Sequence, residues 1–148
     1  MSQILFHLTF PVNDLEQTKR FYVDGLGCTL GRESSTAMTL GLGGHQLVAH
    51  LTEETPESQK GIYPRHFGLI FGSEEEWQTL ADRAKEKGLR FYQQPRRRFS
   101  GSRLEHATFF LEDPFHNLLE FKHYRYRSAI FGERQFSQVG DLEEDSSP

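Results

Sequence analysis

The sequence predicts an α+β fold in which one unit, a strand followed by a helix and three further strands, occurs twice. Two stretches carry this prediction, FHLTFPVND from Phe6 and RHFGLIFGS from Arg65. In both, a histidine lies within an alternating apolar run, and residues that favour a helix start follow that run. Five elements then recur in the same order in each half, which makes a coincidence between two unrelated starts a poor explanation.

The first unit is expected within residues 1–52. Alternation of apolar and polar residues in FHLTFPV predicts a strand with one face covered by a helix. That helix is predicted to begin after Asn13 or Asp14, which are favourable N-cap residues, and to end at Gly25. Three further strands are predicted over residues 29–32, 36–42 and 46–51.

The second unit is expected within residues 62–127. Its first strand is the alternating run that follows His66. The helix after it is predicted to begin at Ser73, which forms a capping-box pattern with Glu76, and to end at Gly88. Three further strands are predicted over residues 90–93, 106–112 and 118–123.

The remaining segments are predicted to lie outside the two units. Residues 53–61 form a polar linker that holds a proline, which is typical of a surface connection. An extension, residues 128–139, follows the last strand, and residues 1–139 are expected to form a single domain. Residues 140–148 combine acidic residues, serine and proline with little apolar surface to bury, which predicts a disordered acidic tail.

Composition narrows the classes of function. The formal net charge of -4 offers no basic field for a nucleic acid. The single cysteine, Cys28, excludes an intrachain disulfide and a cysteine-based zinc site, as expected in a reducing cytoplasm. The N-terminus carries no apolar segment of signal or membrane length. We therefore expect a cytoplasmic protein that binds neither nucleic acid nor a membrane.

Three polar residues are placed where a metal could be held. By strand alternation, His7 and His66 both point away from the helix-covered face, so the two histidines can share the opposite face. Glu120 lies in mid-strand among apolar neighbours, where an unpaired buried carboxylate would be costly, so we expect a cation beside it. Two histidines and one carboxylate are the ligand set of an open octahedral non-haem Fe(II) site. For either histidine alone, a hydrogen-bonded, half-buried side chain is the competing interpretation.

Four stretches resemble the vicinal oxygen chelate superfamily, which includes glyoxalase I, extradiol dioxygenases, fosfomycin-resistance thiol transferases and bleomycin-binding proteins. They are FHLTFPVNDLEQTKRFYVDGLGC, GHQLVAHL, RHFGLIF and DPFHNLLEFKHYRYRSAIF, and the resemblance spans about residues 3–125. Within the superfamily, the chain most resembles the predicted extradiol-dioxygenase group of short bacterial proteins.

The resemblance implies a fold and a ligand set. The two units would be βαβββ modules that form a cup-shaped mixed eight-stranded sheet with helices on its outer face. It assigns His7, His66 and Glu120 as metal ligands, and it implies a homodimer. Fe(II) is the metal expected, with Mn(II), Zn(II) or Ni(II) as alternatives. The sequence leaves open whether the three ligands meet within one chain or between two.

Several positions depart from the family pattern. When HQLVAHL is laid on HNLLEFK, Ala49 falls where Glu120 stands, so the fourth ligand of glyoxalase I-like enzymes is missing. This argues against isomerase chemistry, in which a second carboxylate moves the proton. Extradiol enzymes typically carry a tyrosine and a glycine where this chain has Phe110 and His116. Phe110 is thus a candidate substrate-contacting residue that lacks the hydroxyl.

Further candidates lie just upstream of Phe110. His106 shares the face of Phe110 and is a candidate acid–base residue, with an exposed histidine at a strand start as the alternative. The stretch QQPRRRFSGSR is predicted to be a loop between two strands. From it, Arg98 and Arg103 are candidates to bind an anionic substrate, with a solvated run of charges as the alternative.

Taken together, these residues predict a metal-dependent enzyme, an Fe(II) dioxygenase that acts on a small chelating substrate of aromatic or enediol-like type, with or without an anionic group. A Mn-dependent thiol transferase of the fosfomycin-resistance type is the second possibility. The third is a non-enzymatic small-molecule binding protein of the bleomycin-resistance type, and the intact ligand set counts against it.

Overall fold

The computed structural model describes residues 3–54 and 56–140 and contains the repeated unit. The first unit, module one, consists of β1 (His7–Val12), α1 (Leu15–Lys19) continued by the π-helical turn η1 (Arg20–Gly25), β2 (Thr29–Glu33), β3 (Ala37–Leu42) and β4 (His45–Leu51). The second unit, module two, consists of β5 (Phe67–Ile70), α2 (Glu74–Glu86), β6 (Phe91–Arg98), β7 (His106–Glu112) and β8 (Leu118–Tyr124), followed by the short 3-10 turn η2 (Arg127–Ala129). The predicted acidic tail lies, apart from Gly140, outside the described residues.

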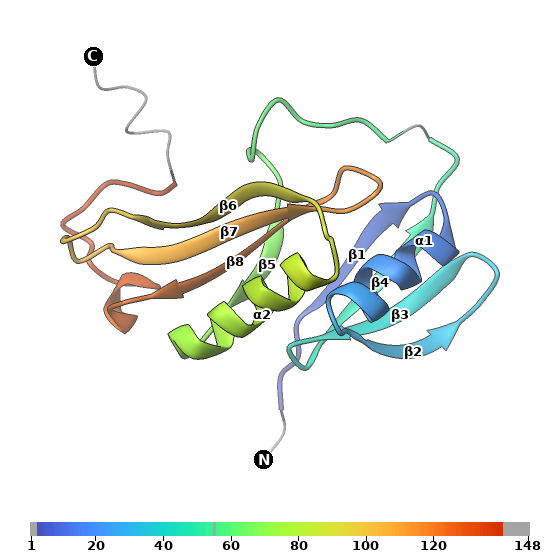
Figure 1. The fold of residues 1–148 in the computed structure, drawn as a ribbon, viewed down its shortest axis with the longest axis horizontal. Coiled ribbons are helices and arrows are strands. Elements are labelled where there is room, and N and C mark those ends of the chain that lie inside the picture. Colours follow the sequence, from blue (N-terminus) through green and yellow to red (C-terminus); the bar gives the residue numbers. More distant parts are fainter. Residues whose placement is uncertain (1–2, 55, 141–148) are drawn as a thin grey trace.

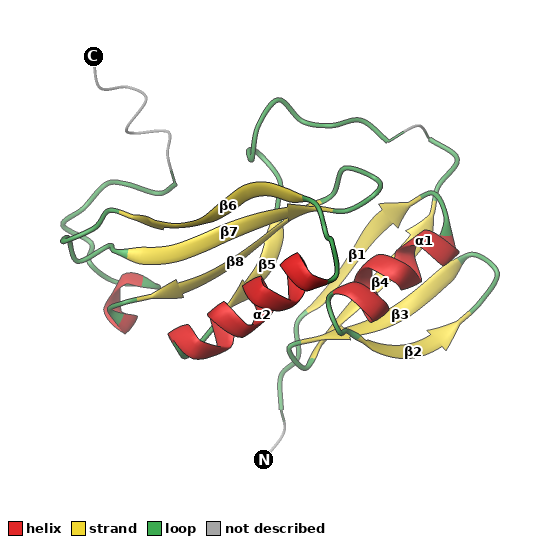
Figure 2. Ribbon diagram, viewed as in Figure 1, coloured by secondary structure: helices red, strands yellow, loops and turns green. Residues whose placement is uncertain are grey.

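The eight strands form two sheets of the same design. Module one has the strand order β1-β4-β3-β2 and module two the order β5-β8-β7-β6. In each sheet the first and last strands of the module run parallel, and the other pairs are antiparallel. The α+β class and the two modules are confirmed, but the strands are divided between two sheets instead of hydrogen-bonding in one. Figures 1 and 2 show the two modules side by side, with α1 and α2 on the same side of the sheets.

The helix starts follow the predicted capping residues. Asp14 accepts a hydrogen bond from the Gln17 backbone N–H through Oδ1 at 2.8 Å. Ser73 accepts one from the Glu76 N–H through Oγ at 3.2 Å. These side chains satisfy N–H groups that the first helical turn leaves without a partner. Helix α2 is followed by Gly88 at a φ of 68°, as its predicted stop requires.

One hydrophobic core extends through both modules. Its buried side chains come from the helices and from the strand faces that the helices cover. The Trp77 indole N–H donates to the Phe121 carbonyl at 2.8 Å, which ties α2 to β8. The Phe10 and Phe67 rings lie 5.4 Å apart, which brings β1 of module one against β5 of module two. The modules are therefore joined by packing and not only by the linker.

A buried polar contact also joins the modules. The Tyr22 hydroxyl donates to Asp113 Oδ2 at 2.7 Å, and both residues are buried. Burial raises the pKa of Asp113, while hydrogen bonds from Asn117, Tyr22 and Phe115 partly offset that effect. The Tyr22–Asp113 contact thus matters because Asp113 has little access to water.

Replacing Tyr22 by Phe is expected to lower the free energy of unfolding by about 1–3 kcal/mol, because a buried acceptor loses a donor. Urea denaturation at neutral pH measures this change. Tyr92→Phe is the matched control, because Tyr92 is exposed in β6. Equal stability of the two variants would contradict the importance of the contact.

Strand β6 is longer than the sequence suggested. The arginine run was predicted to lie in a loop, and that prediction is wrong: Arg96, Arg97 and Arg98 pair in register with Thr108, Ala107 and His106 of β7. The physical reason is that the positive charge of Arg97 is balanced by ion pairs with Glu74 and Glu105. A strand whose arginines have such partners can carry a run of charges that, from the sequence alone, resembles a solvent-exposed loop.

Among residues 3–54 and 56–140, no helix is both long and apolar enough to cross a membrane.

Candidate metal centre

His66 and Glu120 meet on the face of module two that α2 does not cover. His66 immediately precedes β5, and Glu120 lies in the middle of β8. His66 Nε2 is 3.2 Å from Glu120 Oε1. The strands approach closely here because Gly68 pairs with Glu120, and a Cβ at Gly68 would collide with the Glu120 carbonyl oxygen. The predicted pairing of these two residues on one face is present in the structure.

Each member of the pair is oriented by a second contact. His66 Nδ1 lies 2.7 Å from the Ile62 carbonyl, which can only accept, so Nδ1 carries the proton. The Thr108 hydroxyl donates to Glu120 Oε2 at 2.6 Å. One nitrogen, Nε2, and one oxygen, Oε1, therefore face each other. Outer contacts of this kind are typical of metal-ligating side chains.

The electrostatics of the pair keep Glu120 ionised. Burial raises the pKa of Glu120, but the hydrogen bond from His66, the charge of Lys122 and the Thr108 hydroxyl outweigh it and bring that pKa to about 2. Burial lowers the pKa of His66, but its hydrogen bonds to Glu120 and the Ile62 carbonyl outweigh burial and raise the pKa above its ordinary value. The Glu120 carboxylate is therefore ionised at neutral pH, and a divalent ion bound by the pair would compete with the proton on His66.

His7 lies apart from this pair. It is exposed at the start of β1, where its Nδ1 is 2.7 Å from Gln46 Oε1 and its Nε2 is 3.3 Å from Thr9 Oγ1. In the part of the chain that the structure describes, no three His, Cys, Asp or Glu side chains are grouped so as to hold a metal ion. The structure brings together two of the three predicted ligands within one chain and leaves the third on the open face of module one.

The counterpart of Glu120 in module one is Val48, not Ala49. Thr9, two residues after His7, pairs with Val48, just as Gly68, two residues after His66, pairs with Glu120. Ala49 is fully buried on the helix-covered face. The sequence alignment that laid His45 on His116 was therefore wrong by one residue. The conclusion drawn from it is unchanged, because valine cannot supply a fourth ligand.

Phe110 and His106 lie on the same face as Glu120. The Phe110 ring stands edge-on to the His66 ring at 5.0 Å, and Phe110 is fully buried. His106 is 6% exposed, and its Nδ1 lies 3.0 Å from the Leu104 carbonyl. Burial lowers the pKa of His106. The alternative of an exposed histidine at a strand start is therefore wrong.

The two predicted arginines have different surroundings. Arg98 is buried at the end of β6 and pairs in register with His106, on the face that carries the His66–Glu120 pair. Arg103 is directed elsewhere: its Nη2 lies 3.2 Å from Glu133 Oε2, and its guanidinium stacks over the Tyr126 ring at 3.9 Å. Arg98 is thus the arginine that belongs to the surroundings of the pair, and Arg103 holds the C-terminal extension.

Sequence reasoning missed three residues beside the pair: Tyr63, Thr108 and Lys122. Thr108 and Lys122 could have been found, because each lies two residues along a strand from Phe110 or Glu120 and so shares its face. Lys122 Nζ is 3.8 Å from Glu120 Oε1. The Tyr63 ring lies 5.9 Å from the His66 ring, and burial raises the pKa of its hydroxyl while Arg98 opposes that rise. No local period marks Tyr63, because it lies in the irregular segment before β5.

Comparisons with known proteins place this geometry in a family context. Residues 4–121 match the model of the Glyoxalase/Bleomycin resistance protein/Dioxygenase superfamily. A glyoxalase/bleomycin resistance protein/dioxygenase from Alicyclobacillus acidocaldarius is 42% identical, with a TM-score of 0.82 over 86% of this chain and 96% of that one. No curated protein matched the chain.

Two fosfomycin resistance proteins share the fold at lower identity. FosX from Listeria monocytogenes is 19% identical, with a TM-score of 0.67 over 87% of this chain and 99% of that one. A mutant of that protein is known in complex with Mn(II) and 1S,2S-dihydroxypropylphosphonic acid. FosX from Mesorhizobium loti is 20% identical, with a TM-score of 0.61 over 83% and 93% of the two chains. At this identity these two matches show the fold alone, and membership of the extradiol-dioxygenase group stays a prediction.

Proposed function

Because this chain belongs to the Glyoxalase/Bleomycin resistance protein/Dioxygenase superfamily, we propose that it is a metal-dependent oxygenase acting on a small chelating substrate. The metal would be held by His66 and Glu120 of one chain and by His7 of a second copy in a homodimer. The observation that carries the proposal is the approach of His66 Nε2 to Glu120 Oε1 at 3.2 Å, with the outer atoms of both side chains already engaged.

The donor set fits a divalent ion. His66 offers a nitrogen, Glu120 an oxygen, and a further imidazole would complete the two-histidine, one-carboxylate set that suits Fe(II) and leaves positions open. Mn(II), Zn(II) and Ni(II) accept the same donors. When bound, such an ion acidifies and orients a chelating substrate and provides a neighbouring position for oxygen. The remaining work falls to the residues around the pair.

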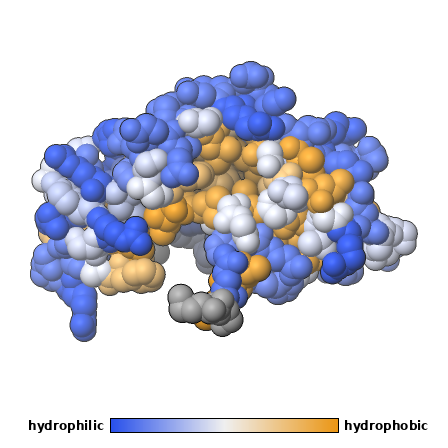
Figure 3. Space-filling view, turned by 90° about the horizontal axis from the view of Figure 1, so that it is seen from below, coloured by the Kyte–Doolittle hydropathy of each residue, from blue (hydrophilic) through white to orange (hydrophobic). Residues whose placement is uncertain are grey.

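A second copy supplies what a single chain lacks. His7 resembles His66 in that its Nδ1 lies against an oxygen acceptor, Gln46 Oε1, whereas its Nε2 lies 3.3 Å from Thr9 Oγ1. Four large apolar side chains near the first strands of the modules are exposed, namely Ile4, Leu5, Phe6 and Ile70. Figure 3 shows apolar side chains gathered across the middle of the underside of the molecule. An exposed apolar area of this kind supports association with another copy.

The residues around the pair suit an anionic or chelating substrate. Phe110 provides an apolar wall against the His66 ring. Lys122 and Arg98 supply positive charge on the same face, which favours an anionic group or a deprotonated oxygen. Tyr63 supplies a hydroxyl near His66. Phe110, which also lies beside His66, has no hydroxyl to offer. The Tyr63 hydroxyl could hold a substrate oxygen or move a proton to or from it.

Oxygen uptake tests the proposal. Protein loaded anaerobically with Fe(II) should consume oxygen with a member of a panel of catechols and hydroxylated aromatic acids. Simple catechol is expected to react slowly or not at all, because Phe110 lacks the hydroxyl that would bind the reacting oxygen, a loss of about one to three kcal/mol or about ten- to a hundredfold in rate. Uptake with no member of the panel, together with thiol transfer to fosfomycin by the Mn(II) form, would replace the oxygenase by the thiol transferase.

Replacing Thr108 by Val is expected to weaken metal binding about 10- to 100-fold, because the Glu120 carboxylate loses the donor that orients it. Calorimetric titration of Mn(II) into the metal-free protein measures the affinity. Thr79→Val is the matched control, since the Thr79 hydroxyl bonds only to the Glu75 carbonyl on the exposed side of α2. An unchanged affinity in Thr108→Val would remove Thr108 from the site.

A further inference from the structure

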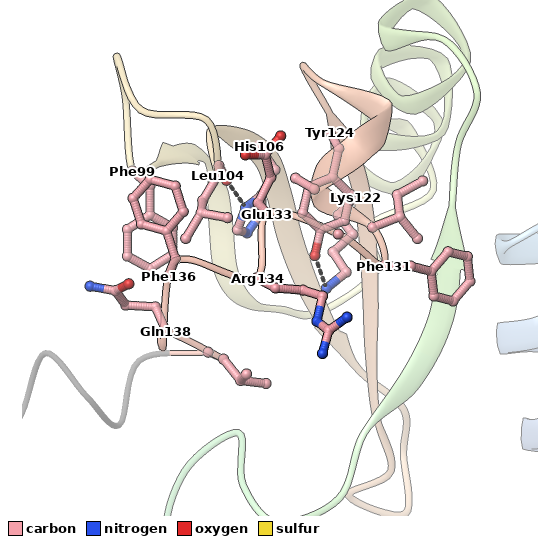
Figure 4. Close-up of a pocket in the computed structure, with 15 residues that line it drawn as sticks. Phe99, Leu104, His106, Lys122, Tyr124, Phe131, Glu133, Arg134, Phe136 and Gln138 are labelled. Carbon is pink, nitrogen blue, oxygen red and sulfur yellow. Dashed lines mark hydrogen bonds between the residues drawn. The ribbon is translucent and has the colours of Figure 1, made fainter.

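The segment after β8 covers a cavity that lies beside the candidate metal centre. The cavity has a volume of about 460 Å³. Its floor is the uncovered face of module two, where His106, Lys122 and Tyr124 line it, and its other side is formed by residues 129–140 (Figure 4). The match to the superfamily model ends at residue 121. The covering segment is therefore additional to the part of the fold that defines the family.

The polar groups of this cavity favour an anion. Lys122 and Arg134 both line it, and Lys122 Nζ donates to the Tyr124 hydroxyl at 3.0 Å. The one carboxylate among the lining side chains, Glu133, is already engaged, because it accepts from Arg103 at 3.2 Å and from Ser128. Its charge is thus neutralised by Arg103, while Arg134 has no carboxylate of its own among the residues that line the cavity.

The apolar groups favour a flat ring. Phe99, Tyr124 and Phe136 contribute aromatic side chains to the cavity, and Figure 4 shows Phe99 and Phe136 on the same side of it. Aromatic side chains pack well against an aromatic ligand, in offset or edge-to-face arrangements. A cavity of this size holds a one-ring compound.

We propose that the cavity beneath residues 129–140 is a binding site for a small aromatic carboxylate, with the carboxylate at Lys122 and Arg134 and the ring against Phe99 and Phe136. Lys122 lies between this cavity and the candidate metal centre, since its Nζ is 3.8 Å from Glu120 Oε1. The bound acid would therefore lie next to that centre. Its binding does not require the metal, so it can be measured whether or not the oxygenase proposal holds.

Ligand-observed NMR on the metal-free full-length protein, followed by calorimetry, tests the site with benzoate and 4-hydroxybenzoate as probes. Benzamide keeps the ring and removes the charge, and acetate keeps the charge and removes the ring. Both are expected to bind at least about tenfold more weakly than benzoate, because each lacks one of the two interactions. Equal affinity for benzoate and either of these probes, or no binding of benzoate at about 10 mM, would overturn the proposal.

Three variants locate the binding. Lys122→Met and Phe136→Ala are expected to weaken benzoate binding by about tenfold each. Arg134→Met is the safeguard against misfolding, because Arg134 is exposed, and it should weaken benzoate binding without altering the circular dichroism spectrum. Arg127→Met is the matched control, since Arg127 is exposed in the same segment and does not line the cavity. Unchanged benzoate affinity in Arg134→Met and Phe136→Ala would show that the cavity is not the site.

Discussion

Glu120→Gln protein is expected to hold less than about a tenth of the metal that the unaltered protein holds, and His7→Ala and His66→Ala protein should lose metal to the same extent. The amide keeps the size of the Glu120 side chain and its contact with Thr108, but it removes the negative charge that attracts the ion. His7→Ala removes an exposed side chain, so it leaves the core undisturbed. Metal analysis of protein purified anaerobically and reloaded with Fe(II) or Mn(II) measures the change.

His50→Ala is the matched control for His7→Ala. His50 is an exposed histidine on the same face of module one, since it pairs with Pro11 of β1. It should keep its full metal content. Metal retention in both Glu120→Gln and His66→Ala would disprove the centre altogether, whereas retention in His7→Ala alone would show that the third ligand comes from another residue.

A dimer assembled from one His7→Ala chain and one Glu120→Ala chain is expected to bind about one metal ion, although each variant alone binds almost none. In the proposed homodimer, one centre of this mixed dimer combines the intact His7 of one chain with the intact His66 and Glu120 of the other. The second centre loses both substituted ligands. Two different affinity tags, applied in sequence, isolate the mixed dimer for metal analysis.

The converse pairing distinguishes a shared site from a site within one chain. A chain that carries both substitutions is paired with an unaltered chain. A shared site predicts almost no metal in this dimer, because each centre then receives one defective chain, whereas a site within one chain predicts about one ion. Failure to isolate any mixed dimer, with a monomeric mass by light scattering, would rule out the shared arrangement.

Local rules of sequence were sufficient for most elements of the fold. Asp14 and Ser73 cap the helices as predicted, and the strand at 106–112 has the predicted bounds. The end of β6 could not be predicted in the same way. Its arginines resemble a solvated loop, and they are stabilised in the strand by partners distant in sequence, including Glu74. Pairing of that kind depends on the tertiary fold, which a local pattern does not contain.

The candidate site was predictable to the same depth. Alternation along a strand placed His66 and Glu120 on one face, because both lie within the same module. Alternation could not predict how His7 lies relative to them, because the packing of one module on the other leaves no periodic pattern in the sequence. The register of Val48 was missed because β4 follows the short turn at Gly43 and Gly44, whereas β8 follows a longer turn in which His116 has a φ of 69°. His45 and His116, which the sequence alignment laid on each other, therefore do not occupy equivalent positions.

The joint core of the two modules has a consequence for how the chain folds and for how it could have arisen. Because Phe10 packs on Phe67 and Tyr22 bonds to Asp113, a module on its own would expose buried rings and a buried polar contact to water. We therefore expect one cooperative unfolding transition, with no stable half, and a chain cut in the linker should refold only when both fragments are present. A duplicated gene segment would gain stability from fusion through this core, while the opposite faces of the sheets stay available for chemistry between molecules.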